Sequence, residues 1–157
     1  MAKLTNHSYI PEGMPQLMPY ITVKDIETSL KFYQTSFGFI PAENPLADGN
    51  TLVHAEMSFH NARIMLGKQG AMQNDSVTPK HSQIQQGIAL YIYCPNVKAH
   101  YEQAKAAGVE IIMEPALMFW GDEMYSAVDN DGYHWSFGEN KETFDLSKVP
   151  PGYNVKK

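Results

Sequence analysis

The sequence predicts an α+β protein in which two repeated β-α-β-β-β units form a curled mixed sheet around a cavity, with the helices on the outer face. The main observation is an internal repeat: Tyr-Ile-Thr-Val-Lys-Asp-Ile at residues 20–26 returns as Tyr-Ile-Tyr-Cys-Pro-Asn-Val at residues 91–97. Each copy is an apolar strand that runs into an Asp or Asn suited to cap a helix. Each predicted helix then ends at a glycine, Gly38 or Gly108.

The first unit, about residues 16–67, begins with an apolar strand and a helix capped by Asp25. Apolar residues Ile26, Leu30 and Tyr33 recur at helical spacing and predict one buried stripe. The Asn-, Pro- and Gly-containing run 44–50 predicts a turn. The predicted elements are a strand over 17–23, a helix over 25–37, a strand starting near residue 39, and strands over 51–59 and 62–67.

The second unit, about residues 87–138, repeats this order. Val97, Tyr101 and Ala104 form the apolar stripe of its helix. The Asp131-Gly132 pair favours a hairpin between the last two strands. The predicted elements are a strand over 88–94, a helix over 96–107, a strand over 109–113, an insertion over 114–122, and strands over 123–128 and 133–137.

The remaining segments are polar and lack periodicity. Residues 68–86 are interpreted as a linker, with a lid as the alternative, and residues 139–157 as a tail. We expect the 157 residues to form one domain, because a unit of about 60 residues buries only about 60% of its unfolded surface. The two units therefore should share a core or a cavity.

Composition excludes several classes of partner. A net charge of −5 argues against nucleic acid, whose phosphates need clustered Lys and Arg, and weakly favours cationic or neutral ligands. No apolar stretch approaches the roughly 20 residues that span a bilayer, so no membrane partner is expected. The single cysteine, Cys94, is expected in the core, and the absence of a targeting segment predicts a cytoplasmic protein without disulfides.

Alternation along the strands separates two faces of the predicted sheet. The apolar face should lie against the helices; it comprises Ile21, Val23, Val53, Ala55, Met57, Phe59, Leu90, Ile92, Cys94, Trp135 and Phe137. The opposite face comprises Met18, Tyr20, Thr22, His54, Glu56, Ser58, Ala89, Tyr91, Tyr93, His134 and Ser136. Three tyrosines among polar groups suit a small-ligand cavity, whereas the alternative is an ordinary solvated sheet face.

The chain resembles the vicinal oxygen chelate superfamily, which includes glyoxalase I, bleomycin-resistance proteins and extradiol dioxygenases. The resemblance covers roughly residues 15–139 and rests on the paired units and on short motifs. These motifs are Val23-Lys24-Asp25-Ile26, Phe32-Tyr33, Gly38-Phe39, His54-Ala55-Glu56-Met57 and Asp129-Asn130-Asp131-Gly132-Tyr133. Phe119-Trp120-Gly121-Asp122 and Gly132-Tyr133-His134-Trp135 are similar to a glyoxalase-like subgroup. The resemblance also implies a homodimer.

In metal-dependent members, the resemblance implies four ligand positions in the cavity. Here they match Met18, Ala89 (or Gly87 in a shifted register), Glu56 and Ser136. Only Glu56 is a good ligand type, and a catalytic metal needs about three protein ligands, so no metal or other cofactor is expected. A substitute site of His54, Glu56 and His134 is the alternative.

Two groups of residues remain as candidates for function. Glu56 and His134 are candidate acid–base residues, because burial without a metal would raise the pKa of Glu56. Trp120 and Asp122 could form an aromatic wall with a carboxylate, suited to a flat or cationic ligand; alternatively, Trp120 fills the core and Asp122 lies in a turn.

These observations predict a metal-independent protein that sequesters or acts on a small organic molecule; whether it is an enzyme stays open. The expected ligand-binding residues are Tyr20, His54, Glu56, Tyr91, Trp120, Asp122 and His134. One alternative is a lyase, isomerase or dioxygenase that depends on a divalent metal. Another is a structural or regulatory dimer without a ligand, in which side chains close the same sheet face.

Overall fold

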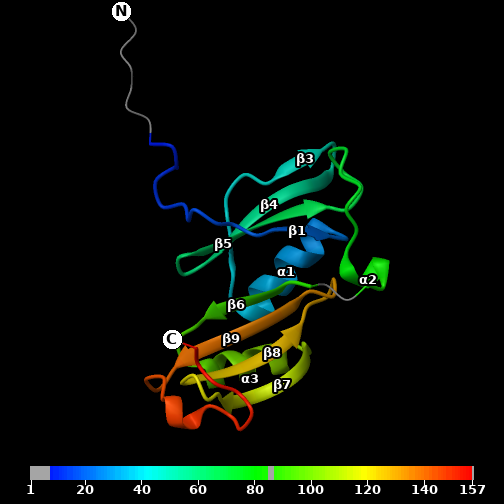
Figure 1. The fold of residues 1–157 in the computed structure, drawn as a ribbon. Helices are drawn as coiled ribbons and strands as arrows, with labels where there is room; N and C mark the ends of the chain where they lie inside the picture. Colours follow the sequence, from blue (N-terminus) through cyan, green and yellow to red (C-terminus); the bar gives the residue numbers. More distant parts are fainter. Residues whose placement is uncertain (1–7, 85–86, 157) are drawn as a thin grey trace, which may run out of the picture.

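The computed structural model describes residues 8–84 and 87–156, and it confirms the α+β class and the two repeated units. Each unit forms its own mixed sheet (Figure 1). In both sheets the first strand pairs in parallel with the last, and the other pairings are antiparallel. The first sheet has the order β1-β5-β4-β2, with β3 also pairing β4, and the second has the order β6-β9-β8-β7.

The strands follow the expected order closely. Those of the first sheet are β1 (Tyr20–Val23), β2 (Ile40–Pro41), β3 (Leu46–Asp48), β4 (Thr51–Phe59) and β5 (Ala62–Lys68). Those of the second sheet are β6 (Ala89–Tyr93), β7 (Glu110–Leu117), β8 (Asp122–Val128) and β9 (His134–Asn140).

One long helix follows the first strand of each unit: α1 (Ile26–Phe37) in the first unit and α3 (Val97–Ala106) in the second. Their predicted caps are confirmed: Asp25 accepts a hydrogen bond from the backbone N–H of Thr28 at 2.8 Å, and Asn96 accepts one from that of Ala99 at 3.2 Å. Helix α1 ends at Gly38, whose φ of 74° suits a residue without Cβ. A short helix α2 (Pro79–Ser82) and a 3-10 turn η1 (Leu146–Lys148) complete the chain.

The helices cover one face of each sheet, and α1 also reaches the other unit (Figure 1). The rings of Tyr33 and Phe37 lie 5.5 Å and 5.7 Å from that of Trp135, measured between centroids, and Phe37 lies 4.7 Å from Phe137. All four side chains are fully buried. Full burial of a large apolar side chain contributes about 1.5–3 kcal/mol, so the two units are held together by one shared aromatic core.

The turn between β8 and β9 adds polar links between the units. Asp129 accepts hydrogen bonds from the hydroxyl of Tyr33 at 2.6 Å and from Nε1 of Trp135 at 2.8 Å. Asp131 accepts one from the hydroxyl of Ser29 at 3.1 Å and one from the backbone N–H of Lys24 at 3.2 Å. Burial raises the pKa of both carboxyls, although these hydrogen bonds oppose it. The Asp-Asn-Asp-Gly motif therefore has a structural role, because it links the two units by hydrogen bonds.

Three expected segments need correction. The run 44–50 contains β3, which pairs with β4, as well as a turn. The expected linker contains α2, and Thr78 before it is buried; its last two residues, 85 and 86, lie outside the described part of the chain. Strand β7 continues to Leu117, which shortens the expected insertion, because its register shifts absorb the irregularity around Pro115.

His100 is buried on the same side of α3 as Val97 and Ala104. Its Nδ1 lies 2.7 Å from the hydroxyl of Tyr125, and its Nε2 lies 2.9 Å from the backbone oxygen of Phe37. Burial lowers the pKa of this imidazole. The neutral ring can satisfy both contacts, with Nε2–H donating to Phe37 and Nδ1 accepting from Tyr125, and so it links α3 to α1. Among the described residues, no helix combines the length and apolarity that crossing a membrane requires.

Candidate functional site

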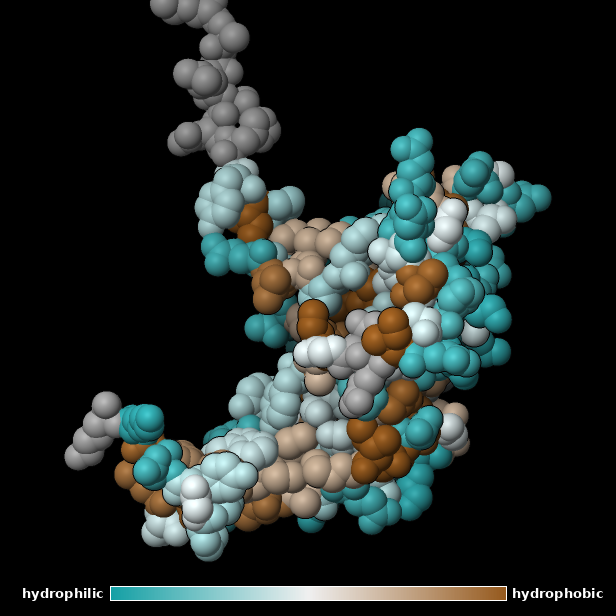
Figure 2. Space-filling view, turned by 45° about the vertical axis from the view of Figure 1, so that its right-hand side comes forward, coloured by the Kyte–Doolittle hydropathy of each residue, from teal (hydrophilic) through white to brown (hydrophobic). Residues whose placement is uncertain are grey.

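The sheet faces turned away from the helices carry the expected ligand-binding residues, and the molecule is hollowed on one side between its two halves (Figure 2). Tyr20, Tyr91 and Tyr93 expose 53%, 42% and 61% of their surface. These rings therefore do not close the face by packing into a core.

In the second repeat, four hydrogen-bond donors meet at the carboxylate of Asp122. Its Oδ2 accepts from the hydroxyls of Tyr91 at 3.0 Å and Tyr93 at 2.9 Å, and from Nε1 of Trp120 at 3.1 Å. Its Oδ1 accepts from the amide of Asn140 at 2.9 Å. Asp122 is 2% exposed, whereas Trp120 is 37% exposed. We call the rings of Tyr91, Tyr93 and Trp120 the aromatic platform.

The electrostatics of Asp122 keep it charged. Burial alone would raise the pKa of this carboxyl, but the hydrogen bonds from Asn140, Tyr93, Tyr91 and Trp120 outweigh it and hold the pKa below its usual value. Partial burial and the bond to Asp122 conversely raise the pKa of Tyr91 to about 12. The platform thus presents neutral phenol and indole rings above a buried anion.

In both repeats the side chain of a tyrosine lies over a glycine. In the second repeat, a Cβ on Gly138 would overlap the hydroxyl of Tyr91 and lie 2.9 Å from its Cζ. In the first repeat, a Cβ on Gly67 would lie 2.8 Å from the hydroxyl oxygen of Tyr20. Each glycine follows its tyrosine by 47 residues, so the internal repeat extends to this contact. The two hydroxyls nevertheless have different partners: Asp122 for Tyr91, and His54 for Tyr20.

The first repeat gathers its own polar group. Nδ1 of His54 lies 3.3 Å from the hydroxyl of Tyr20, and Nε2 lies 3.9 Å from Oε1 of Glu56. Arg63 forms an ion pair with Glu56 at 3.6 Å, which sequence reasoning missed. Alternation along β5 places Arg63 on the same face of the sheet as Met65, which pairs with Glu56 of β4. The spacing along β5 could therefore have indicated that Arg63 lies near Glu56. Glu56 is only partly buried and already has a cationic partner.

His134 lies apart from this group in the sheet. It pairs with Ala89 of β6 and Val128 of β8, whereas His54 and Glu56 lie in β4 of the other sheet. Within residues 8–84 and 87–156, no three His, Cys, Asp or Glu side chains lie close enough to hold a metal ion. The structure therefore does not bring His54, Glu56 and His134 together.

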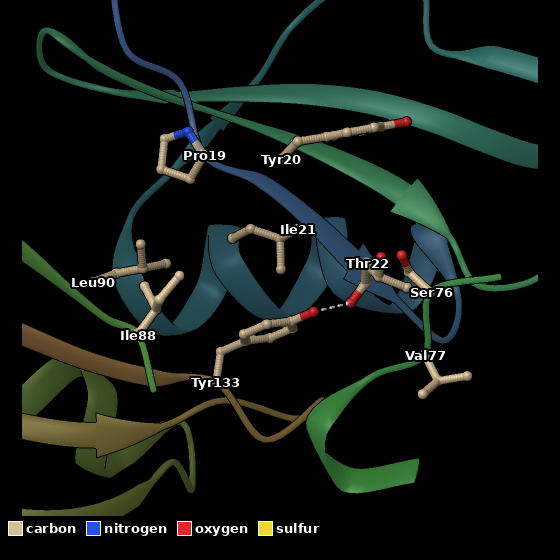
Figure 3. Close-up of a pocket in the computed structure, with 9 residues that line it drawn as sticks. All are labelled: Pro19, Tyr20, Ile21, Thr22, Ser76, Val77, Ile88, Leu90 and Tyr133. Atoms are coloured by element: carbon tan, nitrogen blue, oxygen red, sulfur yellow. Dashed lines mark hydrogen bonds between the residues drawn. The ribbon is translucent and has the colours of Figure 1, made fainter. Parts of the chain in front are cut away.

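A pocket of about 350 Å³ lies between the two halves of the molecule, beside β1 and the start of β6 (Figure 3). Tyr20, Ile88 and Leu90 contribute to its lining, and the hydroxyl of Tyr133 donates to the backbone oxygen of Thr22 at 2.8 Å. Tyr20 is the only residue of the expected site that lines this pocket. The hydroxyl-bearing side chains of its lining are Tyr20, Thr22, Ser76 and Tyr133, and no charged side chain is among the residues that line it.

A described segment near each end of the chain lines a pocket, one with Glu56 and the other with Phe119, whose ring lies 5.0 Å from that of Trp120. Residues 9–18 line a pocket of about 440 Å³ with Glu56. The tail lines one of about 460 Å³ with Phe119, and the ring of Phe144 lies 6.4 Å from that of Phe119. Tyr93 and Asn140 both donate to Asp122. The sequence placed Tyr93 on the cavity face but not among the expected ligand-binding residues, and Asn140 fell in the segment interpreted as a tail.

Residues 13–137 match the model of the Glyoxalase/Bleomycin resistance protein/Dioxygenase superfamily. The chain belongs to this superfamily. An uncharacterized protein of Mycobacterium tuberculosis is 23% identical over 137 residues, which cover 86% of this chain and 80% of that protein.

The fold of this chain is also similar to the folds of solved structures of other proteins. TioX from Micromonospora sp. ML1 has a TM-score of 0.64 at 18% identity and covers 79% of this chain and 97% of its own. The fosfomycin resistance protein FosX from Listeria monocytogenes has a TM-score of 0.59 at 14% identity, with 87% and 98% covered. At these identities the likeness concerns the fold.

The positions where the superfamily resemblance implies a metal do not fit one. Met18 and Glu56 line the same pocket, but Ala89 offers no donor atom on its side chain. The hydroxyl of Ser136 lies 2.8 Å from that of Ser126 and is engaged there. One carboxylate, with a thioether and a hydroxyl, is a poor donor set for a divalent cation that prefers several oxygen or imidazole ligands.

Proposed function

We propose that this protein binds a small organic molecule on the aromatic platform of its second repeat, without a metal ion. The observation that carries the proposal is the set of four hydrogen bonds to Asp122, because it fixes Tyr91, Tyr93 and Trp120 while leaving their rings partly exposed. Fixed aromatic rings give a flat ligand contact area at a low entropic cost.

Binding accounts for this geometry better than acid–base catalysis. Glu56 is engaged by Arg63 at 3.6 Å, and His134 lies in the other sheet. The expected acid–base pair therefore does not share one reacting position. Tyr20, His54 and Glu56 form a separate candidate contact group in the first repeat, where the hydroxyl of Tyr20 and Nδ1 of His54 lie 3.3 Å apart.

We propose in addition that the protein works as a homodimer. Large apolar side chains stay exposed near the β1 and β6 edges of the two sheets: Leu17 is 83% exposed and Ile88 is 73% exposed. Exposed strand edges with apolar neighbours favour association with a second copy. Light scattering coupled to size exclusion measures the mass directly, and a monomer across the working concentration range would rule out this part of the proposal.

The binding proposal is tested by thermal unfolding in EDTA with a panel of small aromatic molecules of different charge. A ligand at about 100 times its Kd adds about 2.7 kcal/mol. For a domain of this size we expect the Tm to rise by about 5–10 °C. Trp120→Ala should abolish the shift, whereas Leu46→Ala, which removes an exposed apolar side chain from β3 of the first sheet, should preserve it.

Two results would count against metal-free binding. If no member of the panel shifts the Tm, the platform is not a binding site for such molecules. If protein purified without chelator carries about one divalent metal per chain, and Glu56→Ala removes it, the metal-dependent alternative is correct.

A further inference from the structure

We infer that the ligand of the aromatic platform is an organic cation, such as a quaternary ammonium or a guanidinium compound. The inference rests on the proposed function and adds the charge of the ligand to it. It depends on three observations: a buried anion without a cationic partner, rings that donate their polar hydrogens to that anion, and an exposed side of those rings.

The first observation is the uncompensated charge of Asp122. Its four partners, Tyr91, Tyr93, Trp120 and Asn140, are all neutral donors. Among the described residues, the ion pairs include Glu123 and Glu139 in the neighbouring strands but not Asp122. Asp122 is 2% exposed, so the four neutral donors stabilise its carboxylate without cancelling its net negative charge, and the surrounding protein screens that charge less than water does. A cation above the platform would balance this charge.

The second observation concerns the rings themselves. The hydroxyls of Tyr91 and Tyr93 and the indole N–H of Trp120 all point to Oδ2 of Asp122. A donor that gives its hydrogen bond to an anion is polarised, so electron density on its ring increases. The negative ring faces then attract cations more strongly, and tryptophan is the best of the aromatic side chains for this contact.

The third observation decides which kind of cation fits. Oδ2 already accepts three hydrogen bonds, and the residue is 2% exposed, so a small metal ion that needs direct oxygen ligands has no approach to it. The rings remain partly accessible instead: Tyr93 is 61% exposed, and Trp120 is 37% exposed beside the ring of Phe119, whose centroid lies 5.0 Å away. An organic cation can use these rings without displacing a hydrogen bond. The net charge of −5 favours the same class of ligand.

Tryptophan fluorescence gives a local readout. The chain has two tryptophans, Trp120 in the platform and Trp135, which is fully buried in the core. We propose titration of the full chain with benzyltrimethylammonium, benzyl alcohol and benzenesulfonate, which share one ring and differ in charge. The cation should quench fluorescence saturably, with a Kd at least about tenfold below that of the neutral probe. The anion should bind most weakly.

Variants separate charge from shape. Asp122→Asn keeps the size of the side chain and removes its charge, so the cation should lose its roughly tenfold advantage over benzyl alcohol. Tyr93→Phe keeps the charge and the ring, and the preference for the cation should persist. If Asp122→Asn does not fold, as judged by near-UV circular dichroism, the comparison of three probes on the wild type still decides the question.

Each outcome has a clear meaning. Preference for the cation in the wild type supports the inference, and its loss in Asp122→Asn assigns it to this carboxylate. Equal binding of the cation and benzyl alcohol would overturn the inference but leave the proposed binding function intact. Stronger binding of benzenesulfonate would also overturn it. Absence of quenching by all three probes, together with a negative result for the wider thermal panel, would overturn both the inferred preference for a cation and the proposed binding function.

Discussion

Replacing Gly138 by Ala tests whether the contact of Tyr91 over this glycine controls the aromatic platform. The added Cβ would overlap the tyrosine hydroxyl and lie 2.9 Å from Cζ, so the ring must move away. Its 3.0 Å hydrogen bond to Asp122 would then break. A hydrogen bond to a charged group contributes about 1.5–3 kcal/mol, and the low end applies because the ring is 42% exposed.

The substitution also has a compensating effect. Gly→Ala at a position without strain stabilises by about 0.4–1 kcal/mol through the unfolded chain. The net loss in the free energy of unfolding is therefore about 0.5–1 kcal/mol, measurable by urea denaturation with fluorescence detection. The pKa of Tyr91, raised to about 12 in the wild type, should fall toward its ordinary value near 10, as followed by tyrosinate absorbance.

A double-mutant cycle with Tyr91→Phe provides the control. In the Phe background no hydroxyl hydrogen bond remains to be lost, although the new Cβ still lies 2.9 Å from Cζ of the ring, so Gly138→Ala should cost less there, with a coupling energy of about 1.5 kcal/mol. Strict additivity of the two substitutions would refute the reasoning, because it would mean that the alanine acts on something other than this hydroxyl. Unchanged titration of Tyr91 in Gly138→Ala would refute it as well.

The remaining predictions concern the core and the tail. Because burial lowers the pKa of His100, the unfolded chain binds its proton first, so stability should fall as pH drops below about 6.5; His100→Gln should flatten that part of a stability–pH profile measured by urea. Asp129→Ala leaves the buried hydroxyl of Tyr33 and the indole N–H of Trp135 without an acceptor, and should destabilise by about 3 kcal/mol or more in the same assay; a loss below about 1 kcal/mol would contradict this account. Gly121→Ala places a Cβ against the carbonyl oxygen of Glu142 at a φ of 100°, so residues 141–156 should become more accessible to limited proteolysis, while Gly49→Ala, where nothing lies near the new Cβ, should not have this effect.

The sequence predicted the parts of the fold that depend on local pattern. The repeat, the capping residues Asp25 and Asn96 and the alternation along β4 each follow from steric and hydrogen-bonding preferences that act over a few residues. The site was predicted in part. Tyr91, Trp120 and Asp122 do lie together, whereas His134 does not join His54 and Glu56.

The features of the fold and of the site that were not predicted depend on contacts between residues far apart in the sequence, which the periodicity of apolar residues does not predict. The spacing of His100 from Val97 and Ala104 places it on the buried side of α3, but the hydrogen bonds of its ring to groups from β8 and α1 could not be read from that spacing. Asn140 was placed in the tail because polar composition there resembles a loop, and only the extension of β9 brings its amide to Asp122. The ion pair between Arg63 and Glu56 joins diagonal neighbours, because Glu56 pairs with Met65 and Arg63 pairs with Ser58, so it depends on the conformations of two long side chains that the register alone does not specify.

The carboxylates of Asp129 and Asp131 belong to the second repeat, but Tyr33, Ser29 and Lys24, which donate to them, belong to the first. The second half produced alone would keep the hydrogen bonds that Asp129 accepts within its own repeat but would lose those from Tyr33, Ser29 and Lys24. Coexpression of the two halves as separate polypeptides, cut in the connection before β6, would thus be expected to reconstitute one molecule by fragment complementation. The duplicated halves have become obligate partners, and a change in the turn of one must be matched by the first helix of the other.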